Sequence, residues 1–182
     1  MKLILVTGLP GAGKTEFAEV ARSLGLPVVS MGDAVRAEAQ RRGLPVSRET
    51  LSELAHQLRK DRGPGVVAEL CLTQLRSLGS STAVIDGVRS PAEVAVFRHA
   101  ANKVVVVGIH AAPRVRFERL RSRGRADDPR SWEVFQNRDR EELGFGIGAV
   151  LALADVLLVN ESSLFEFRRK AACLLQQLVE DP

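Results

Sequence analysis

Short apolar runs alternate with longer segments of helical character along the chain. Five runs rich in valine, isoleucine and leucine, each bounded by polar or turn residues, predict β-strands. They span residues 2–7, 27–30, 83–85, 103–109 and 155–159. Unbroken apolar runs of this kind are typical of strands that are covered on both faces of a parallel sheet. The pattern therefore predicts an α/β fold, in which a five-stranded parallel sheet carries helices on both faces.

Helix start signals mark the segments between these strands. Ser90-Pro91-Ala92-Glu93 supplies an N-cap serine, a proline at the first helical position and the glutamate of a capping box. The segment 163–166 repeats the box before the last helix, and Ser47 is placed to cap a further helix. Residues 34–78 are long enough for two or three helices between the second and third strands. That is more chain than a simple crossover needs.

The segment 8–15 reads GLPGAGKT and fits the phosphate-binding loop pattern G-x-x-x-x-G-K-[ST]. It follows the first predicted strand directly and precedes helix-forming residues, which is the context that the motif requires. An incidental glycine-rich turn with a lysine would not be expected to match both the full pattern and its setting. The chain is therefore predicted to be a P-loop NTPase.

Each position of this loop has a physical role in binding a nucleotide. Glycines at 8, 11 and 13 let the chain turn sharply, so that backbone N–H groups reach the β-phosphate oxygens. The following helix directs its positive dipole end at the same anion. Lys14 adds a full charge against the β- and γ-phosphates, and the hydroxyl of Thr15 can bind Mg²⁺. The predicted nucleotide-binding residues of the loop are Gly8, Gly11, Ala12, Gly13, Lys14 and Thr15.

Length and composition predict a single domain spanning residues 1–182. No linker, repeat or low-complexity tract interrupts the sequence, and its length is sufficient for a substantial core. No secretory signal and no apolar stretch of membrane-spanning length is recognisable, so we expect a soluble, cytoplasmic protein. Cys71 and Cys173 lie in apolar, helix-like contexts and are expected to be buried free thiols.

The charge pattern favours phosphate handling over nucleic-acid binding. The formal net charge is only +4, and nine arginines lie between residues 114 and 140. The arginine guanidinium is a forked donor that matches phosphate geometry. Aromatic residues within this segment are few, with Trp132 and Phe135 in its second half, so a stacking platform for single-stranded nucleic acid is poorly supported.

Three further motifs carry a resemblance to a known family. Residues 32–36 read GDAVR after the second strand, and residues 86–89 read DGVR after the third. Both resemble the monophosphate-binding motifs of adenylate kinase and its nucleoside monophosphate kinase relatives. The segment from Arg119 to Asp139 looks like their lid. The chain from residue 3 to about 160 most closely resembles the archaeal adenylate-kinase-related P-loop proteins, with a weaker likeness to dephospho-coenzyme A kinases.

The resemblance implies an acceptor site at the carboxyl ends of the second and third strands. Arg36 would bind the acceptor phosphate, beside Gly32 and Asp33, within a helical acceptor-binding region at 34–78. Arg89 would bridge the acceptor and the transferred phosphoryl group, next to Gly87. Asp86, and with it Asp33, would hold Mg²⁺ through bound water, with Thr15 as a direct ligand. Two alternatives remain open: Asp33 as a simple helix cap, and Asp86-Gly87 as a simple turn.

The resemblance also implies a short lid at residues 119–140. Arg119 would stack on the adenine of the phosphate donor, while Arg123, Arg125 and Arg138 would reach its phosphates. One or two of these arginines could instead pair with Asp127, Asp128 or Glu133. Asn160 falls where the family has an adenine-contacting loop, but we expect it to be a turn asparagine.

Three functional hypotheses follow. The first is an ATP- and Mg²⁺-dependent kinase whose acceptor is AMP, CMP or a similar nucleoside monophosphate. The second keeps the kinase and makes dephospho-coenzyme A or another larger molecule the acceptor. The third is a nucleotide-dependent switch or an RNA-associated ATPase. Two acceptor-side arginines, Arg36 and Arg89, favour a kinase, because a switch needs no second phosphorylated ligand.

Overall fold

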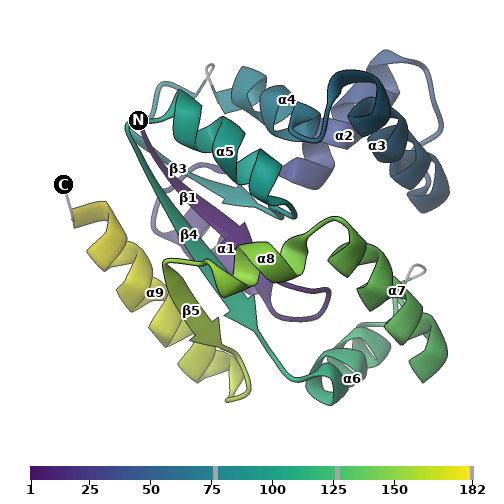
Figure 1. Ribbon diagram of the computed structural model, residues 1–182. Helices are drawn as coiled ribbons and strands as arrows, with labels where there is room; N and C mark the ends of the chain where they lie inside the picture. Colours follow the sequence, from purple (N-terminus) through teal and green to yellow (C-terminus); the bar gives the residue numbers. More distant parts are fainter. Residues whose placement is uncertain (76–77, 126–127, 181–182) are drawn as a thin grey trace.

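A parallel β-sheet forms the centre of the computed structural model, which describes residues 1–75, 78–125 and 128–180. The described strands lie in the order β2-β3-β1-β4-β5, and all four pairings are parallel (Figure 1). Their bounds are β1 Lys2–Thr7, β2 Val28–Ser30, β3 Thr82–Asp86, β4 Lys103–His110 and β5 Val156–Val159. The predicted five-stranded parallel sheet is confirmed, and the predicted strand ends are correct to within one residue.

The register of the sheet brings the predicted motifs to one edge. In β1, Val6 lies opposite Asp86 of β3, and Thr7 lies opposite Gly108 of β4. All six residues of β1 are buried, as expected for the central strand of a sheet covered on both faces. Since the strands are parallel, the loop after β1 and the loop after β3 leave the sheet side by side.

Helices cover both faces of the sheet, as predicted. On one face, α1 and α9 pack against each other and against the sheet; α4, α5 and α8 lie on the other face (Figure 1). The described helices are α1 Lys14–Ser23, α2 Met31–Arg41, α3 Arg48–Arg62, α4 Val66–Leu75, α5 Pro91–Ala100, α6 Pro113–Arg123, α7 Trp132–Gly144, α8 Ile147–Ala152 and α9 Leu164–Glu180.

The predicted helix caps are confirmed in detail at two places. The Ser47 hydroxyl accepts a hydrogen bond from the backbone N–H of Thr50, and Ser90 forms the complete capping box with Glu93. The segment at 34–78 holds three helices, α2 to α4, although residues 76 and 77 lie outside the described residues. The first of them begins earlier than predicted.

Helix α2 starts directly at the end of β2, because Ser30 is its N-cap. The Ser30 hydroxyl accepts a hydrogen bond from the backbone N–H of Asp33 at 3.3 Å. The alternative in which Asp33 itself caps the helix is therefore wrong. Gly32 and Asp33 lie in the first turn of α2, where the carboxylate of Asp33 is favoured by the positive end of the helix dipole.

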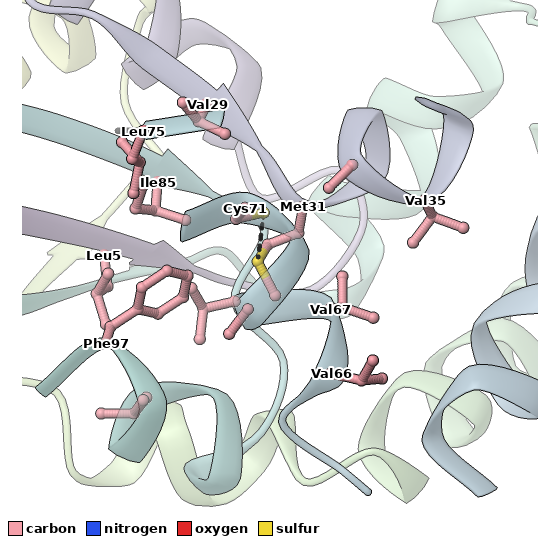
Figure 2. Close-up of a cluster of buried hydrophobic side chains, with 14 of the residues drawn as sticks. Leu5, Val29, Met31, Val35, Val66, Val67, Cys71, Leu75, Ile85 and Phe97 are labelled. Carbon is pink, nitrogen blue, oxygen red and sulfur yellow. Dashed lines mark hydrogen bonds between the residues drawn. The ribbon is translucent and has the colours of Figure 1, made fainter. Parts of the chain in front are cut away.

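A cluster of buried side chains joins α2, α4 and α5 to the sheet (Figure 2). Leu5 and Ile85 of neighbouring strands lie beside Phe97 of α5, and all three are fully buried. Within the same cluster, the thiol of Cys71 on α4 donates to the sulfur of Met31 at 3.3 Å (Figure 2). Soft contacts of this kind adapt readily to irregular packing. The cluster therefore fixes the start of α2 relative to the sheet.

The two cysteines differ in accessibility. Both are free, as predicted, but Cys173 on α9 is exposed, so its predicted burial is wrong. Helix α9 is amphipathic, and position 173 falls on its solvent side, which an apolar sequence context alone does not reveal. Burial raises the pKa of the Cys71 thiol to about 12.

We therefore expect a thiol-specific reagent to modify one cysteine of the native protein and two after denaturation. The thiolate is the reactive form, and Cys71 is protonated and shielded in the fold. Counting modified thiols by mass spectrometry, with peptide mapping to locate the first, measures this. Rapid native modification of Cys71 would contradict the described packing of α4.

A paired carboxylate on α2 predicts a dependence of stability on pH. Glu38 is buried, and its carboxylate accepts hydrogen bonds from Arg41 and Arg42 at 2.7 Å. The bonds from Arg41 are the largest cause that lowers the pKa of Glu38 to about 2. A carboxyl group whose pKa is lower in the folded state stabilises the fold above its unfolded-state pKa, and this contribution disappears as the pH falls toward the folded-state pKa.

The contribution of Glu38 should therefore be lost progressively between about pH 5 and about pH 2. We expect Glu38→Gln to lower the free energy of unfolding near neutral pH and to reduce its decline in acid. Urea denaturation of both proteins across this pH range measures the difference. Parallel acid profiles for the two proteins would show that Glu38 does not contribute.

No helix in the described part of the chain combines the length and apolar character needed to cross a membrane.

Candidate active site

The glycine-rich loop connects the central strand to α1 and forms the floor of a cavity. Gly13 is the residue before α1, with φ of 114°, a conformation that L side chains rarely adopt. A Cβ atom at this position would lie 2.2 Å from the side-chain nitrogen of Asn160. Asn160 is buried, and its amide donates to the carbonyl of Ala12 at 2.8 Å. The simple interpretation of Asn160 as a turn residue is therefore wrong, since it supports the loop from behind.

The amino group of Lys14 points back along the loop. It donates to the carbonyl of Gly8 at 2.6 Å and lies 3.4 Å from that of Leu9. Burial lowers the pKa of Lys14, and the nearby carboxylates of Asp86 and Glu142 oppose that shift. The ammonium group thus lies at the centre of the loop, where backbone carbonyls hold it and a phosphate could replace them.

Two buried oxygens at the end of neighbouring strands have no hydrogen-bond partner among the described residues. They are the Thr7 hydroxyl on β1 and Oδ1 of Asp86 on β3. Burial raises the pKa of the Asp86 carboxyl, against the opposing field of Lys14. The exposed Thr15 hydroxyl lines the adjoining cavity. Oxygen donors of this kind suit Mg²⁺, which usually keeps several of its waters, so the residues present fit the predicted hydrated ion.

Four arginines of the segment 119–140 line the same cavity as the glycine-rich loop. Arg123 pairs with the buried Asp128 through two hydrogen bonds, one of them 2.9 Å long, and these lower the pKa of Asp128. The backbone N–H of Arg125 donates to the same carboxylate. Arg138 on α7 lies 4.0 Å from it. Of the three carboxylates predicted as alternative partners for these arginines, Asp128 is therefore one that pairs with Arg123, and Asp127 lies outside the described residues.

Arg119 extends toward Asn160, the residue that supports the glycine-rich loop. One guanidinium nitrogen lies 3.4 Å from the side-chain oxygen of Asn160, while the other terminal nitrogen is buried without a partner in the described structure. Its predicted stacking on adenine remains a prediction.

Beyond the end of β3, Arg89 pairs with a carboxylate that sequence reasoning missed. Its Nε lies 3.2 Å from Glu142 of α7, whose side chain is 14% exposed. The guanidinium groups of Arg89 and Arg59 lie 5.9 and 4.7 Å from the ring centre of Phe145. Helix α3 therefore meets the end of α7 beside Arg89. The sequence signal that could have indicated Glu142 was its position four residues after Arg138, which places both side chains on one face of a helix.

These groups surround one cavity of about 460 Å³. That volume lies within the usual range for small-molecule sites. The predicted residues that line it are Gly8, Gly11, Gly13, Lys14, Thr15, Gly87, Arg89, Arg119, Arg123, Arg125 and Arg138. The cations come from the loop, the end of β3, α6 and its following turn, and α7, so separate segments do converge on one pocket.

Five predicted residues do not line this cavity. Ala12 is buried within the loop, and Asp86 lies behind it, within electrostatic range of Lys14. Gly32, Asp33 and Arg36 lie on α2 outside the cavity, where Arg36 forms an exposed ion pair with Asp33. The predicted pair of acceptor arginines is therefore only half assembled in this structure, with Arg89 at the cavity and Arg36 away from it.

The sheet order, the glycine-rich loop and the cavity define the chain as a protein with the P-loop kinase fold. A family model described as an AAA domain matches residues 7–136. A UPF0200 protein from Hyperthermus butylicus is 52% identical over 176 residues, which cover 97% of this chain and 94% of that protein. The chain belongs to the UPF0200 family. The predicted relationship to archaeal P-loop proteins is thereby confirmed.

Solved structures support the same fold at low sequence identity. The Thermus thermophilus protein TT1252 is similar, with a TM-score of 0.68, 19% identity and coverage of 97% of each chain. A dephospho-CoA kinase from Campylobacter jejuni has a TM-score of 0.63, 17% identity and coverage of 98% of each chain. At these identities the likeness establishes the fold.

Proposed function

We propose that this protein transfers the γ-phosphoryl group of ATP, with Mg²⁺, to a nucleoside monophosphate or a related small phosphorylated acceptor. The observation that carries the proposal is the convergence of Lys14, Arg89, Arg123, Arg125 and Arg138 on one cavity beside the glycine-rich loop. Transfer between two phosphorylated molecules brings two anions together, so cations must approach from several directions. Arg89, which follows β3, would supply positive charge for the second of these anions.

The loop side would hold the donor. Backbone N–H groups at the start of α1 and the ammonium of Lys14 would bind the β- and γ-phosphates, replacing the carbonyl contacts of Gly8 and Leu9. Arg123, Arg125 and Arg138 would face the transferred group from the segment 119–140, which we propose acts as a short lid. Mg²⁺, when bound near Thr15 and Asp86, would neutralise charge on the β- and γ-oxygens.

The other side would hold the acceptor. Arg89 would release Glu142 and bind an acceptor phosphate, and Arg36 would likewise release Asp33 and bind that phosphate. The Arg36–Asp33 pair is exposed and three residues apart on a helix, so its rupture costs only about 0.2–0.5 kcal/mol. A hydrogen bond to a charged phosphate contributes about 1.5–3 kcal/mol. Exchange is therefore favourable, provided that α2 to α4, as an acceptor-binding region, move toward the cavity.

A dephospho-coenzyme A-like acceptor is the second candidate. A fold like that of the Campylobacter jejuni dephospho-CoA kinase, over 98% of this chain, is compatible with this alternative. A larger acceptor would also use Arg89, so the described cavity is compatible with both.

A coupled assay of the purified protein with ATP and Mg²⁺ tests the proposal. The panel should contain AMP, CMP, the other nucleoside monophosphates and dephospho-coenzyme A, and each product should be identified by mass. We expect one acceptor to be phosphorylated for each ATP consumed; with AMP as the acceptor both products are ADP, so two ADP should form for each ATP lost. Formation of ADP without a phosphorylated acceptor would instead favour the nucleotide switch.

A further inference from the structure

A buried ion pair lies directly behind the cavity, and none of the roles above includes it. The guanidinium of Arg116 on α6 donates to both carboxylate oxygens of Asp139 on α7, at 2.9 and 2.6 Å. The two side chains are 3% and 15% exposed. The same guanidinium lies 4.8 Å from the ring centre of Phe135, also on α7. Arg116 therefore links two helices that each supply arginines to the cavity.

The same side chain also holds the tip of the glycine-rich loop. One terminal nitrogen of Arg116 donates to the carbonyl of Pro10 at 3.1 Å, and its Nε donates to the carbonyl of Ala111 at 3.1 Å. The backbone of the loop at Gly11 and that of α6 at Arg116 lie close together. A Cβ atom on Gly11 would be only 2.8 Å from the carbonyl oxygen of Arg116. Three segments, namely the loop, the end of β4 and α7, thus meet on one guanidinium group.

The consequence for α7 follows from helical spacing. One face of α7 carries four of these residues. Arg138, Asp139 and Glu142 follow Phe135 by three, four and seven positions, which is the spacing of side chains on one face of a helix. Phe135 and Asp139 contact Arg116, while Arg138 and Glu142 line the cavity. Fixing Asp139 therefore fixes the rotation of α7 and the direction in which Arg138 enters the cavity.

Stability alone is a weak reason for such a pair. Desolvation of two buried charges commonly cancels their attraction, and apolar residues of similar size are often as stable. Lysine could not replace the arginine, because an ammonium group lacks the planar fork that reaches a carboxylate bidentately while also donating to two carbonyls.

We propose that Arg116 is a positioning residue, which holds the tip of the glycine-rich loop and the cavity face of α7 in one geometry for phosphoryl transfer. The inference rests on the proposed kinase function. Arg116 acts through Pro10 and through Asp139, and it does not touch the phosphates itself.

The variants Arg116→Lys and Asp139→Asn test this proposal by two readouts. The first readout is steady-state kinetics. In both variants kcat should fall at least about tenfold while KM for ATP changes less than about threefold, because misplacement of a catalytic group affects transfer more than binding. The second readout is independent of turnover. Trp132, the sole tryptophan, lies in the first turn of α7 and stacks on Phe135, so acrylamide quenching of its emission should increase in both variants.

Glu19→Gln is the control, because Glu19 also pairs with an arginine, Arg22, but is exposed on α1 and does not line the cavity. It should change neither kcat nor the quenching of Trp132. Normal kcat and normal quenching in both Arg116→Lys and Asp139→Asn would overturn the proposal, as would an equal loss of kcat in Glu19→Gln. If the wild type phosphorylates no acceptor, the kinase proposal fails. The acrylamide quenching of Trp132 in the two variants, measured with and without Mg²⁺ and ADP, still decides whether Arg116 holds α7: an increase over the wild type supports this role, and no increase contradicts it.

Discussion

Replacing Lys14 with alanine is expected to lower kcat by about 10²–10³ while the fold remains intact, by analogy with the loss of one preorganised donor. The ammonium group lies within the glycine-rich loop, 2.6 Å from the Gly8 carbonyl, at the position where the β- and γ-phosphates of a nucleotide would bind. No other lysine lines the described cavity. The measurement is steady-state kinetics with the acceptor identified in the coupled assay, together with a thermal melt.

Lys170→Ala provides the control for this substitution. Lys170 lies on α9 and is exposed, so its loss should change neither kcat nor the melting temperature. A Lys14→Ala protein that retained normal turnover would remove Lys14 from its proposed role. A variant that failed to fold would show a lower melting temperature, and its kinetics would then say nothing about the ammonium group.

Replacing Arg89 with alanine is expected to damage transfer more than donor binding. Its contacts to the transferred group would strengthen as charge moves, so kcat should fall by about 10². Affinity for ATP should change little, because Arg89 follows β3 and its guanidinium pairs with Glu142 of α7 in this structure. Pre-steady-state kinetics and direct titration with an ATP analogue separate the two effects.

Arg98→Ala is the matched control for Arg89, since Arg98 is an exposed arginine on the helix that follows. It should leave both quantities unchanged. Equal losses of ATP affinity and kcat in Arg89→Ala would place Arg89 in donor binding and would contradict the acceptor-side assignment.

The elements that sequence reasoning predicted correctly are those with strong local signals. Apolar runs located the five strands, because the strands of a parallel sheet that is covered on both faces are rich in apolar residues. The pattern GLPGAGKT located the loop, whose glycines are required by backbone geometry as well as by the ligand. Caps at Ser47 and Ser90 were predictable because their hydrogen bonds join residues only three apart.

Several contacts that sequence reasoning missed join distant segments of the chain. Asn160 supports the loop across 148 positions of the chain, and Arg116 reaches Pro10 across 106. No local pattern encodes such partners. The exposure of Cys173 likewise depends on which face α9 turns toward the sheet.

The position of Arg36 illustrates a different limit. Its motif predicts a role in acceptor binding, but α2 begins at Met31, and the guanidinium of Arg36 finds Asp33 on the same helix face. An arginine without its phosphate pairs with the nearest carboxylate, and a residue three positions away on a helix is always near. Whether Arg36 reaches the acceptor therefore depends on a ligand-linked movement that the motif does not describe.

The central claim is that one cavity holds two anionic ligands end to end. Calorimetric titration of AMP into protein saturated with a non-hydrolysable ATP analogue and Mg²⁺ tests it most directly, with CMP and dephospho-coenzyme A as parallel titrants. The account predicts that one of these binds with one-to-one stoichiometry without displacing the analogue, and that Arg89→Ala weakens this second binding event. Displacement of the analogue by every titrant would contradict the account and would leave a site for a single nucleotide.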